Sequence, residues 1–129
     1  TAPLQKYKNV HLHECFLTSK EIASIHKTHG IYIGTTRSDT QGVSRSEAMS
    51  SGLVAIANNC TAIPEFMDDT CGILIPPESY VELADAIERL YNDPALFQRL
   101  SENAAKRIRS QTSKEFTIDK EVALIRQNR

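Results

Sequence analysis

Apolar and polar residues alternate in blocks along this chain, and the blocks predict strands that alternate with helices. Short apolar runs predict strands over residues 9–14, 31–34, 53–57 and 72–75. Apolar positions three and four residues apart predict helices over residues 19–29, 44–51 and 81–91, then a helix that begins at Asp93-Pro94 and a terminal helix. This alternation predicts an α/β fold whose parallel sheet has right-handed crossovers, with a helical C-terminal part.

The last two predicted helices each carry an apolar stripe. The stripes comprise Phe97, Leu100, Ala104 and Ile108 on the first helix, and Ile118, Val122 and Ile125 on the second. Lys106, Arg107 and Arg109 cluster near the C-terminal end of the first helix, where the helix dipole favours cations. The cluster predicts a solvated helix face, and a contact with an anionic membrane is the alternative.

Two acids, Asp39 and Glu47, bracket a loop and the helix start that follows it. In an open parallel sheet, ligands collect at the carboxyl edge of the strands, where loops and helix N-termini converge. Gly42 allows a ligand to approach the backbone, and the free N–H groups of Val43 and Ser44 can point at an anion. We therefore expect Asp39 and Glu47 to face one cavity, with these amides between them.

Each acid also has a purely structural interpretation. Residues 44–47 fit a capping box, in which Ser44 caps the helix and the Glu47 carboxylate accepts a hydrogen bond from the backbone N–H of Ser44. Asp39 fits an ordinary polar loop. The longer string that contains both acids favours a binding site.

Three linked motifs run in order from this helix to the last predicted strand. They are Glu47-Ala48-Met49-Ser50-Ser51-Gly52-Leu53-Val54-Ala55-Ile56-Ala57, Thr61-Ala62-Ile63-Pro64-Glu65 and Cys71-Gly72-Ile73-Leu74-Ile75-Pro76-Pro77. Together with the loop they resemble the donor-binding segment of the retaining GT-B glycosyltransferases of group 1, which use nucleotide-diphosphate sugars. The resemblance covers most of the chain and implies the Rossmann-like C-terminal domain of such an enzyme.

The resemblance implies a role for each residue of the loop and helix start. Asp39 helps to hold the donor sugar and Glu47 binds the ribose hydroxyls, so these two acids are the candidate catalytic residues. The backbone from Gly42 to Ser44 meets the sugar hydroxyls and the phosphates. The implied donor-binding residues are Thr40, Gln41, Gly42, Val43, Ser44 and Glu47.

The chain departs from the family pattern at three places. Asp39 stands where the family usually has glutamate, so its carboxylate reaches one methylene less far. Thr40-Gln41 stands where the family usually has Gly-Phe, and Val54 stands where it usually has proline.

The resemblance also implies parts that the chain lacks. Residues 1–129 resemble the later part of one donor-binding domain, so we expect a single partial domain, inactive alone, of an enzyme with a separate N-terminal acceptor domain. The family's strand order places two further strands between those predicted over residues 9–14 and 31–34. We therefore expect self-association through unpaired strand edges.

The implied reaction is retaining transfer to a glycan or lipid-linked acceptor, as in polysaccharide biosynthesis. No nucleophile is assigned, because Ser44 and Ser46 lack a Gly-x-Ser-x-Gly frame. Two alternatives stay open. A sugar-nucleotide 2-epimerase shares the GT-B architecture, and its Asp-Ser-Gly-Gly-x-Gln-Glu-Glu stretch is distantly similar to residues 38–43. A non-catalytic α/β binding module is the other alternative.

Composition and charge limit the partners. With 129 residues, 40% of them hydrophobic, the chain is long enough for a single core. Fifteen basic and sixteen acidic residues give a net charge of −1, so nucleic acid is not expected as a partner. No apolar run approaches the roughly 20 residues of a transmembrane helix, and no signal segment precedes the fold. We expect a cytoplasmic location, and the inner membrane surface is an alternative location for the parent enzyme.

Cysteine and histidine usage agrees with that location. The three cysteines Cys15, Cys60 and Cys71 are odd in number, so a disulfide framework is not expected. His11, His13 and Cys15 would share one face of a strand but lack a fourth metal ligand. We expect no metal and no cofactor beyond the nucleotide-diphosphate sugar that serves as substrate.

Overall fold

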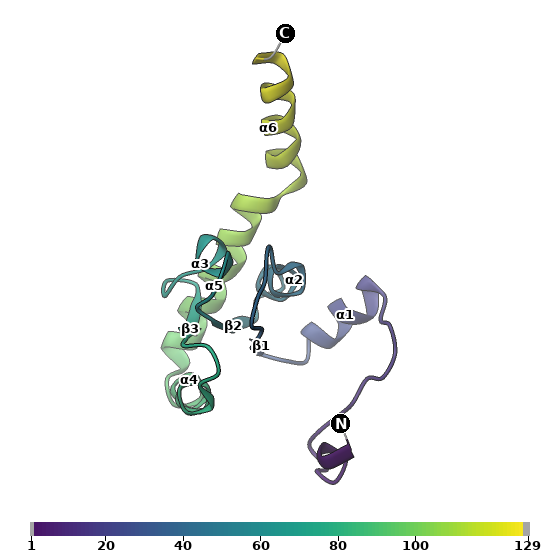
Figure 1. The fold of residues 1–129 in the computed structure, drawn as a ribbon, viewed down its shortest axis with the longest axis vertical. Helices are drawn as coiled ribbons and strands as arrows, with labels where there is room; N and C mark the ends of the chain where they lie inside the picture. The colour runs from purple at the N-terminus through teal and green to yellow at the C-terminus, as the bar shows by residue number, and fades with distance from the viewer. Residues whose placement is uncertain (1, 128–129) are drawn as a thin grey trace.

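The computed structural model describes residues 2–127 and contains a three-stranded parallel sheet with helices on both faces (Figure 1). The strands are β1 (Ile31–Gly34), β2 (Val54–Asn58) and β3 (Gly72–Ile75), in the spatial order β1-β2-β3. The helices are η1 (Ala2–Leu4), α1 (Ser19–His26), α2 (Val43–Ser50), α3 (Ile63–Phe66), α4 (Tyr80–Asn92), α5 (Pro94–Thr112) and α6 (Lys114–Gln127). The predicted α/β fold with a parallel sheet is confirmed.

The central strand β2 is buried along its whole length, because its alternate side chains enter cores on the two faces of the sheet. The core beside α4 and the first half of α5 contains Val54, Ile56, Ile75, Ala86, Leu90, Leu96 and Leu100. The core beside α2, α3 and the second half of α5 contains Met49, Ala55, Ala57, Ile63, Met67, Cys71, Ala104 and Ile108. Burial on both faces explains the unbroken apolar run at residues 53–57.

Helix α5 begins at the predicted residues and joins the two cores. The Asp93 carboxylate accepts a hydrogen bond from the Leu96 N–H at 2.9 Å, and Pro94 occupies the first turn, where its missing N–H costs nothing. Leu100 lies in one core and Ala104 in the other. The predicted apolar stripe of this helix is therefore what holds it across the sheet.

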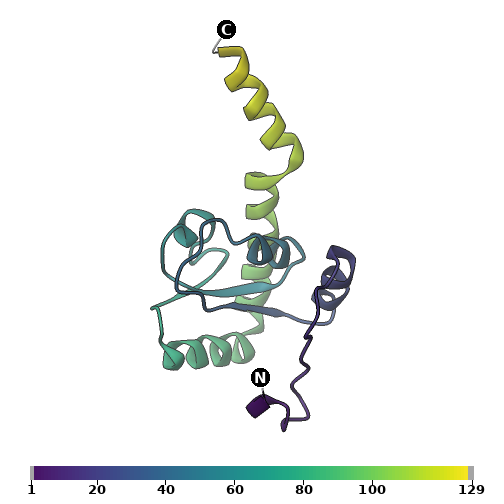
Figure 2. The ribbon, with the colours of Figure 1, turned by 45° about the vertical axis from the view of Figure 1, so that its right-hand side comes forward.

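Residues 9–14 form no strand, so this predicted element is wrong. A strand exists only through hydrogen bonds to a neighbouring strand, and no strand among residues 2–127 pairs with this segment. The segment runs as irregular chain between η1 and α1, away from the sheet (Figure 2). Alternation along a strand therefore cannot bring His11, His13 and Cys15 to one face. Within residues 2–127, no three His, Cys, Asp or Glu side chains lie close enough together to hold a metal ion.

The remaining helices differ from the predictions mainly at their ends. Helix α1 stops at His26, before the predicted end at residue 29, and the Thr28 hydroxyl then bonds to the Ile25 carbonyl. Helix α6 continues from α5 away from the sheet (Figure 1), and none of its residues is buried. The residues of its predicted apolar stripe, Ile118, Val122 and Ile125, remain exposed. Within residues 2–127, every helix is too short or too polar to cross a bilayer.

Candidate functional site

The start of α2 depends on Gly42. This residue precedes the helix with a left-handed φ of +65°, which glycine adopts without steric cost. A Cβ at this position would lie 2.6 Å from Arg45 Cζ and 2.7 Å from Asp39 Oδ2, so glycine lets both side chains approach the backbone. The predicted capping box is wrong, because Gly42 caps the helix in place of Ser44 and no side chain bonds to its first N–H groups.

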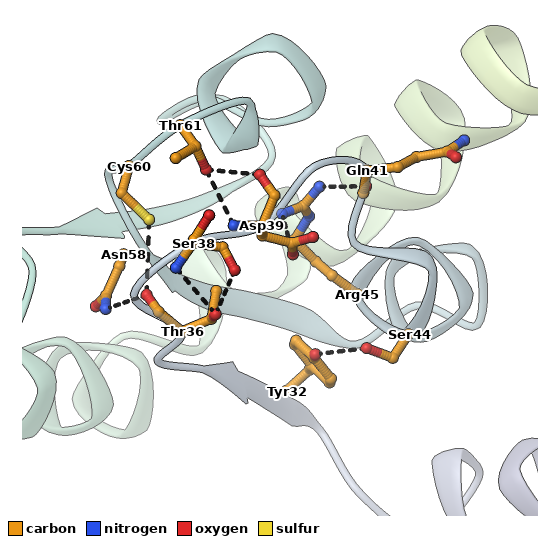
Figure 3. Close-up of polar contacts among 10 residues, drawn as sticks. All are labelled: Tyr32, Thr36, Ser38, Asp39, Gln41, Ser44, Arg45, Asn58, Cys60 and Thr61. Carbon is orange, nitrogen blue, oxygen red and sulfur yellow. Dashed lines mark hydrogen bonds and ion pairs between the residues drawn. The ribbon is translucent and has the colours of Figure 1, made fainter.

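The loop between β1 and α2 is tied to β2 and to the turn after it (Figure 3). The Asp39 N–H donates to Thr61 Oγ1 at 3.1 Å, and the Thr61 hydroxyl donates to the Asp39 carbonyl at 2.6 Å. Earlier in the loop, the Asn58 side-chain amide donates to the Thr36 carbonyl at 2.8 Å. The loop therefore takes its shape from residues more than twenty positions away in the sequence.

Arg45 is buried beneath this loop, with only 2% of its surface exposed. Its Nη2 donates to the Gln41 carbonyl at 2.8 Å, and its Nη1 lies 3.6 Å from Asp39 Oδ2. The guanidinium also lies 5.7 Å from the centre of the Phe66 ring, within the range of a cation–π contact. Its Nε has no hydrogen-bond partner among the described residues. A buried cation thus supports a loop that carries a partly exposed carboxylate.

A cavity of about 430 Å³ opens at the carboxyl ends of β1 and β2, and both Asp39 and Arg45 line it. Its other lining residues are Tyr32, Gly34, Thr35, Thr36, Ser38, Ser44 and Ala57. The Tyr32 and Ser44 hydroxyls form a hydrogen bond at 2.9 Å (Figure 3). Hydroxyls, a carboxylate and a guanidinium in one hollow suit a polyhydroxylated or anionic ligand. We call this hollow the Asp39 cavity.

Glu47 lines a second cavity, of about 350 Å³, between α2 and the C-terminal end of α5. Its other lining residues are Gln41, Val43, Ser46, Ser50, Ile108, Arg109, Thr112 and Ser113. The prediction that Asp39 and Glu47 face one cavity is therefore wrong. The helical period explains the separation, because Arg45, which lies beside Asp39, and Glu47 are two positions apart on α2 and so project roughly 200° apart around its axis. We call this second hollow the Glu47 cavity.

The other predicted donor-binding residues lie at the start of α2 and in the loop before it, where Ser44 lines the Asp39 cavity and Val43 lines the Glu47 cavity. Within the helix, the Ser46 N–H is the first to bond to a backbone carbonyl, that of Gly42 at 2.9 Å. The N–H groups of Val43 and Ser44 precede it and lie at the positive end of the helix. Thr40 is exposed and lines neither cavity, whereas the Gln41 side chain borders the Glu47 cavity.

A further cavity, of about 520 Å³, lies at the same edge of the sheet near the start of α4. Arg37 and Glu78 meet across it in an ion pair of 2.7 Å, and both side chains are largely exposed. None of the predicted site residues lines this cavity. We therefore place the candidate site at the Asp39 and Glu47 cavities.

Two residues of the site escaped prediction from the sequence. Arg45 shares a helix face with the buried Ala48 and Met49, three and four positions later, so a charge on that apolar face was a signal that sequence inspection could have used. Thr61 opens the second of the three motifs, but nothing in the motif predicted its backbone, because a β-branched residue is not expected at its left-handed φ of +46°.

The family model described as glycosyl transferases group 1 matches residues 4–107. Alpha-D-kanosaminyltransferase from Streptomyces kanamyceticus is 32% identical over 91 residues, which make up 70% of this chain and 24% of that protein. The chain thus spans about a quarter of the length of this curated relative.

Two solved structures share the fold and part of the sequence. Sucrose-phosphate synthase from Thermosynechococcus elongatus matches with a TM-score of 0.75 and 25% identity, over 84% of this chain and 27% of that one. The C-terminal domain of a glycosyl transferase group 1 family protein from Francisella tularensis matches with a TM-score of 0.69 and 27% identity, over 77% of this chain and 51% of that one.

Proposed function

The chain belongs to the group 1 glycosyl transferases, and we propose that it supplies the donor-binding part of an enzyme that transfers a sugar, with retention, from a nucleotide-diphosphate sugar to a glycan or lipid-linked acceptor. The observation that carries this proposal is the Asp39 cavity, which opens beside the start of α2 at the carboxyl edge of the sheet. This is where open α/β sheets bind their ligands.

We propose that the donor lies across the tip of α2. Its sugar enters the Asp39 cavity, its diphosphate meets the N–H groups of Val43 and Ser44, and its ribose reaches Glu47 in the neighbouring cavity. This arrangement keeps the role expected for each residue and does not require the two acids to share one hollow. Thr40 and Gln41 then border the path between the cavities.

Catalysis in this proposal rests on electrostatics and orientation. Retaining transfer builds positive charge on the sugar ring and negative charge on the departing diphosphate. The helix start, whose backbone dipoles are already oriented, stabilises the negative charge. Asp39 orients the sugar, since a reactant held in place gains effective concentration.

The rest of the enzyme lies outside these residues in this proposal. A further domain supplies the acceptor site and the remaining phosphate contacts, and the chain alone binds donor weakly. We propose that the enzyme acts in the cytoplasm; the three unpaired cysteines, Cys15, Cys60 and Cys71, suit a reducing compartment. The family match favours transfer over the 2-epimerase and over a non-catalytic module.

Titration of the chain with pairs of ligands tests the donor site. Each pair consists of a nucleotide sugar (UDP-glucose, UDP-N-acetylglucosamine, GDP-mannose or ADP-glucose) and its nucleoside diphosphate, with dissociation constants measured by ligand-observed NMR. Asp39→Asn should weaken binding of the nucleotide sugar roughly tenfold, because it removes a charged hydrogen bond to the sugar. It should leave the affinity for the nucleoside diphosphate unchanged. Glu47→Gln should weaken binding of both the nucleotide sugar and the nucleoside diphosphate, because both contain the ribose.

Two exposed acids away from the site serve as matched controls. Asp69 lies in the turn before β3, at the opposite edge of the sheet, and Glu88 lies on α4. The variants Asp69→Asn and Glu88→Gln should bind both ligands as the wild type does. A wild-type chain that binds no nucleotide sugar would overturn the proposal. Equal effects of the site and control variants would remove Asp39 and Glu47 from it.

A further inference from the structure

Thr61 holds a backbone conformation that threonine rarely adopts. Its φ is +46°, in the left-handed region that favours glycine, and it lies in the turn between β2 and α3. Among residues 2–127 only one other non-glycine residue, Glu78, has a positive φ. Such strain persists where surrounding contacts compensate for it, and it is often found at functional sites.

The contact that accompanies this conformation is made to Asp39. The Thr61 hydroxyl accepts a hydrogen bond from the Asp39 N–H at 3.1 Å and donates one to the Asp39 carbonyl at 2.6 Å (Figure 3). One side chain therefore binds the donor and the acceptor of a single residue's backbone. These two bonds restrict the orientation of both peptide groups that flank Asp39.

A restrained backbone has a direct effect on a short side chain. With only two side-chain torsions, the Asp39 carboxylate is placed largely by the backbone that carries it. On its other side the carboxylate lies 3.6 Å from the Arg45 guanidinium. Thr61 from the β2–α3 turn and Arg45 from α2 thus restrain Asp39, which lines the Asp39 cavity, from two elements.

We propose that Thr61 is a positioning residue that sets the place of the Asp39 carboxylate for the donor sugar. This inference rests on the proposed function of Asp39. It explains why a strained threonine occupies a turn that glycine would adopt freely: glycine would relieve the strain but would lose the hydroxyl.

Three variants separate the hydroxyl from the strain. Thr61→Gly removes both, Thr61→Val removes the hydroxyl and keeps the β-branch, and Thr61→Ser keeps the hydroxyl. With the ligand pairs described above, Thr61→Gly and Thr61→Val should each weaken binding of the nucleotide sugar roughly tenfold. Neither should change the affinity for the nucleoside diphosphate. Thr61→Ser should bind both as the wild type does. Thr61→Gly should melt no lower than Thr61→Val, because it relieves the backbone strain, and binding is compared at a temperature where both variants are folded.

Glu78→Gly is the control for strain, because it relieves the other positive φ and meets the loop at Arg37, through an exposed ion pair, and not at Asp39. It should leave binding unchanged. The inference would be overturned if Thr61→Gly and Thr61→Val bound the nucleotide sugar with wild-type affinity. It would also be overturned if they lost as much affinity for the nucleoside diphosphate as for the nucleotide sugar.

Hydrogen exchange keeps this inference distinct from the proposed function. The Asp39 amide should exchange faster in Thr61→Gly and Thr61→Val than in the wild type, and unchanged exchange would show that the restraint does not exist. If exchange behaves as expected but the wild type binds no nucleotide sugar, the proposed function fails and the role assigned to Thr61 fails with it. If the wild type binds the nucleotide sugar and Asp39→Asn weakens that binding while Thr61→Gly and Thr61→Val do not, only the role proposed for Thr61 fails.

Discussion

The Asp39 carboxylate lies 3.6 Å from the guanidinium of Arg45, although the two side chains occupy different environments. The Arg45 side chain is 2% exposed and the Asp39 side chain is 26% exposed. Burying a cation is costly unless it is paired and hydrogen-bonded, and Arg45 meets this requirement through Asp39 and the Gln41 carbonyl. The Asp39 carboxylate in the loop therefore stabilises the buried guanidinium of Arg45 on α2.

Substitution of Arg45 should separate its charge from its bulk. Arg45→Met keeps an apolar side chain in the core but removes the hydrogen bond to Gln41, so we expect it to lower the free energy of unfolding by about 1–3 kcal/mol. Arg45→Ala also leaves a cavity, and the expected loss is about 2–5 kcal/mol. Urea unfolding measures both. A wild-type unfolding free energy for Arg45→Met would show that the guanidinium does not stabilise the loop.

Two glycines with positive φ should respond differently to alanine. Gly42→Ala places a Cβ against Arg45 and Asp39 as well as straining the backbone, and we expect a loss of about 1–3 kcal/mol. Gly52→Ala, with φ +89°, meets only Ser101 Oγ at 3.5 Å, so its loss should reflect backbone strain alone, about 1–2 kcal/mol. Unfolding free energies of the two variants give the comparison. Equal losses would show that the crowding at Gly42 is relieved by movement of the loop.

Local patterns predicted most of the fold because local physics determines those elements. The unbroken apolar run of β2 reflects burial on both faces, and Asp93-Pro94 starts α5 through its own side chains. The strand over residues 9–14 was wrong because a strand also needs a partner, which a single segment cannot reveal. The start of α2 was misplaced because Gly42 turns the chain before Ser44 can act as a cap.

For the site, the sequence located the loop but not its supports. Asp39 and Gly42 follow a strand and precede a helix, and the pattern placed them correctly at the carboxyl edge. Thr61 reaches Asp39 across twenty-two residues, and such a tertiary contact leaves no periodic pattern. Glu47 lines its own cavity because α5 covers that side of α2, and this packing was not predictable from the motif alone.

Asp68 should make stability depend on pH in the acidic range. Hydrogen bonds from the hydroxyl and N–H of Thr70, with a smaller contribution from the Arg107 charge, lower the pKa of the Asp68 carboxyl. A lowered folded-state pKa stabilises the fold above the unfolded-state value of about 4, and this contribution is lost as the pH falls through the folded-state pKa.

Asp68→Asn should therefore be less stable than the wild type near neutral pH, and the difference should shrink in strong acid. The effect should be small, since the Asp68 side chain is 44% exposed. Urea unfolding at a series of pH values measures it, with the exposed neighbour Asp69→Asn as the control. A difference that stays constant as the pH falls would contradict the assignment.

The open edge of β1 should make the chain self-associate. Within residues 2–127, β1 pairs only with β2, so its other edge leaves backbone groups available to a second chain. Ile33 on this strand is 47% exposed. We expect reversible dimers at raised concentration, measured by light scattering over a dilution series, and Ile33→Lys should weaken them because a charge on an edge strand opposes pairing.

Helix α6 offers another surface for a dimer, because Ile125 on it is 63% exposed. The outer edge of β3, which within residues 2–127 also pairs only with β2, offers a third. Ile125→Lys is therefore the matched variant: the same substitution at an exposed apolar position, on a helix, whose side cannot pair with a strand through backbone hydrogen bonds. If association runs through β1, Ile125→Lys dimerises as the wild type does and Ile33→Lys does not. The reverse result would place the contact on α6, and a chain that stays monomeric at every concentration would show that the β1 edge does not recruit a partner.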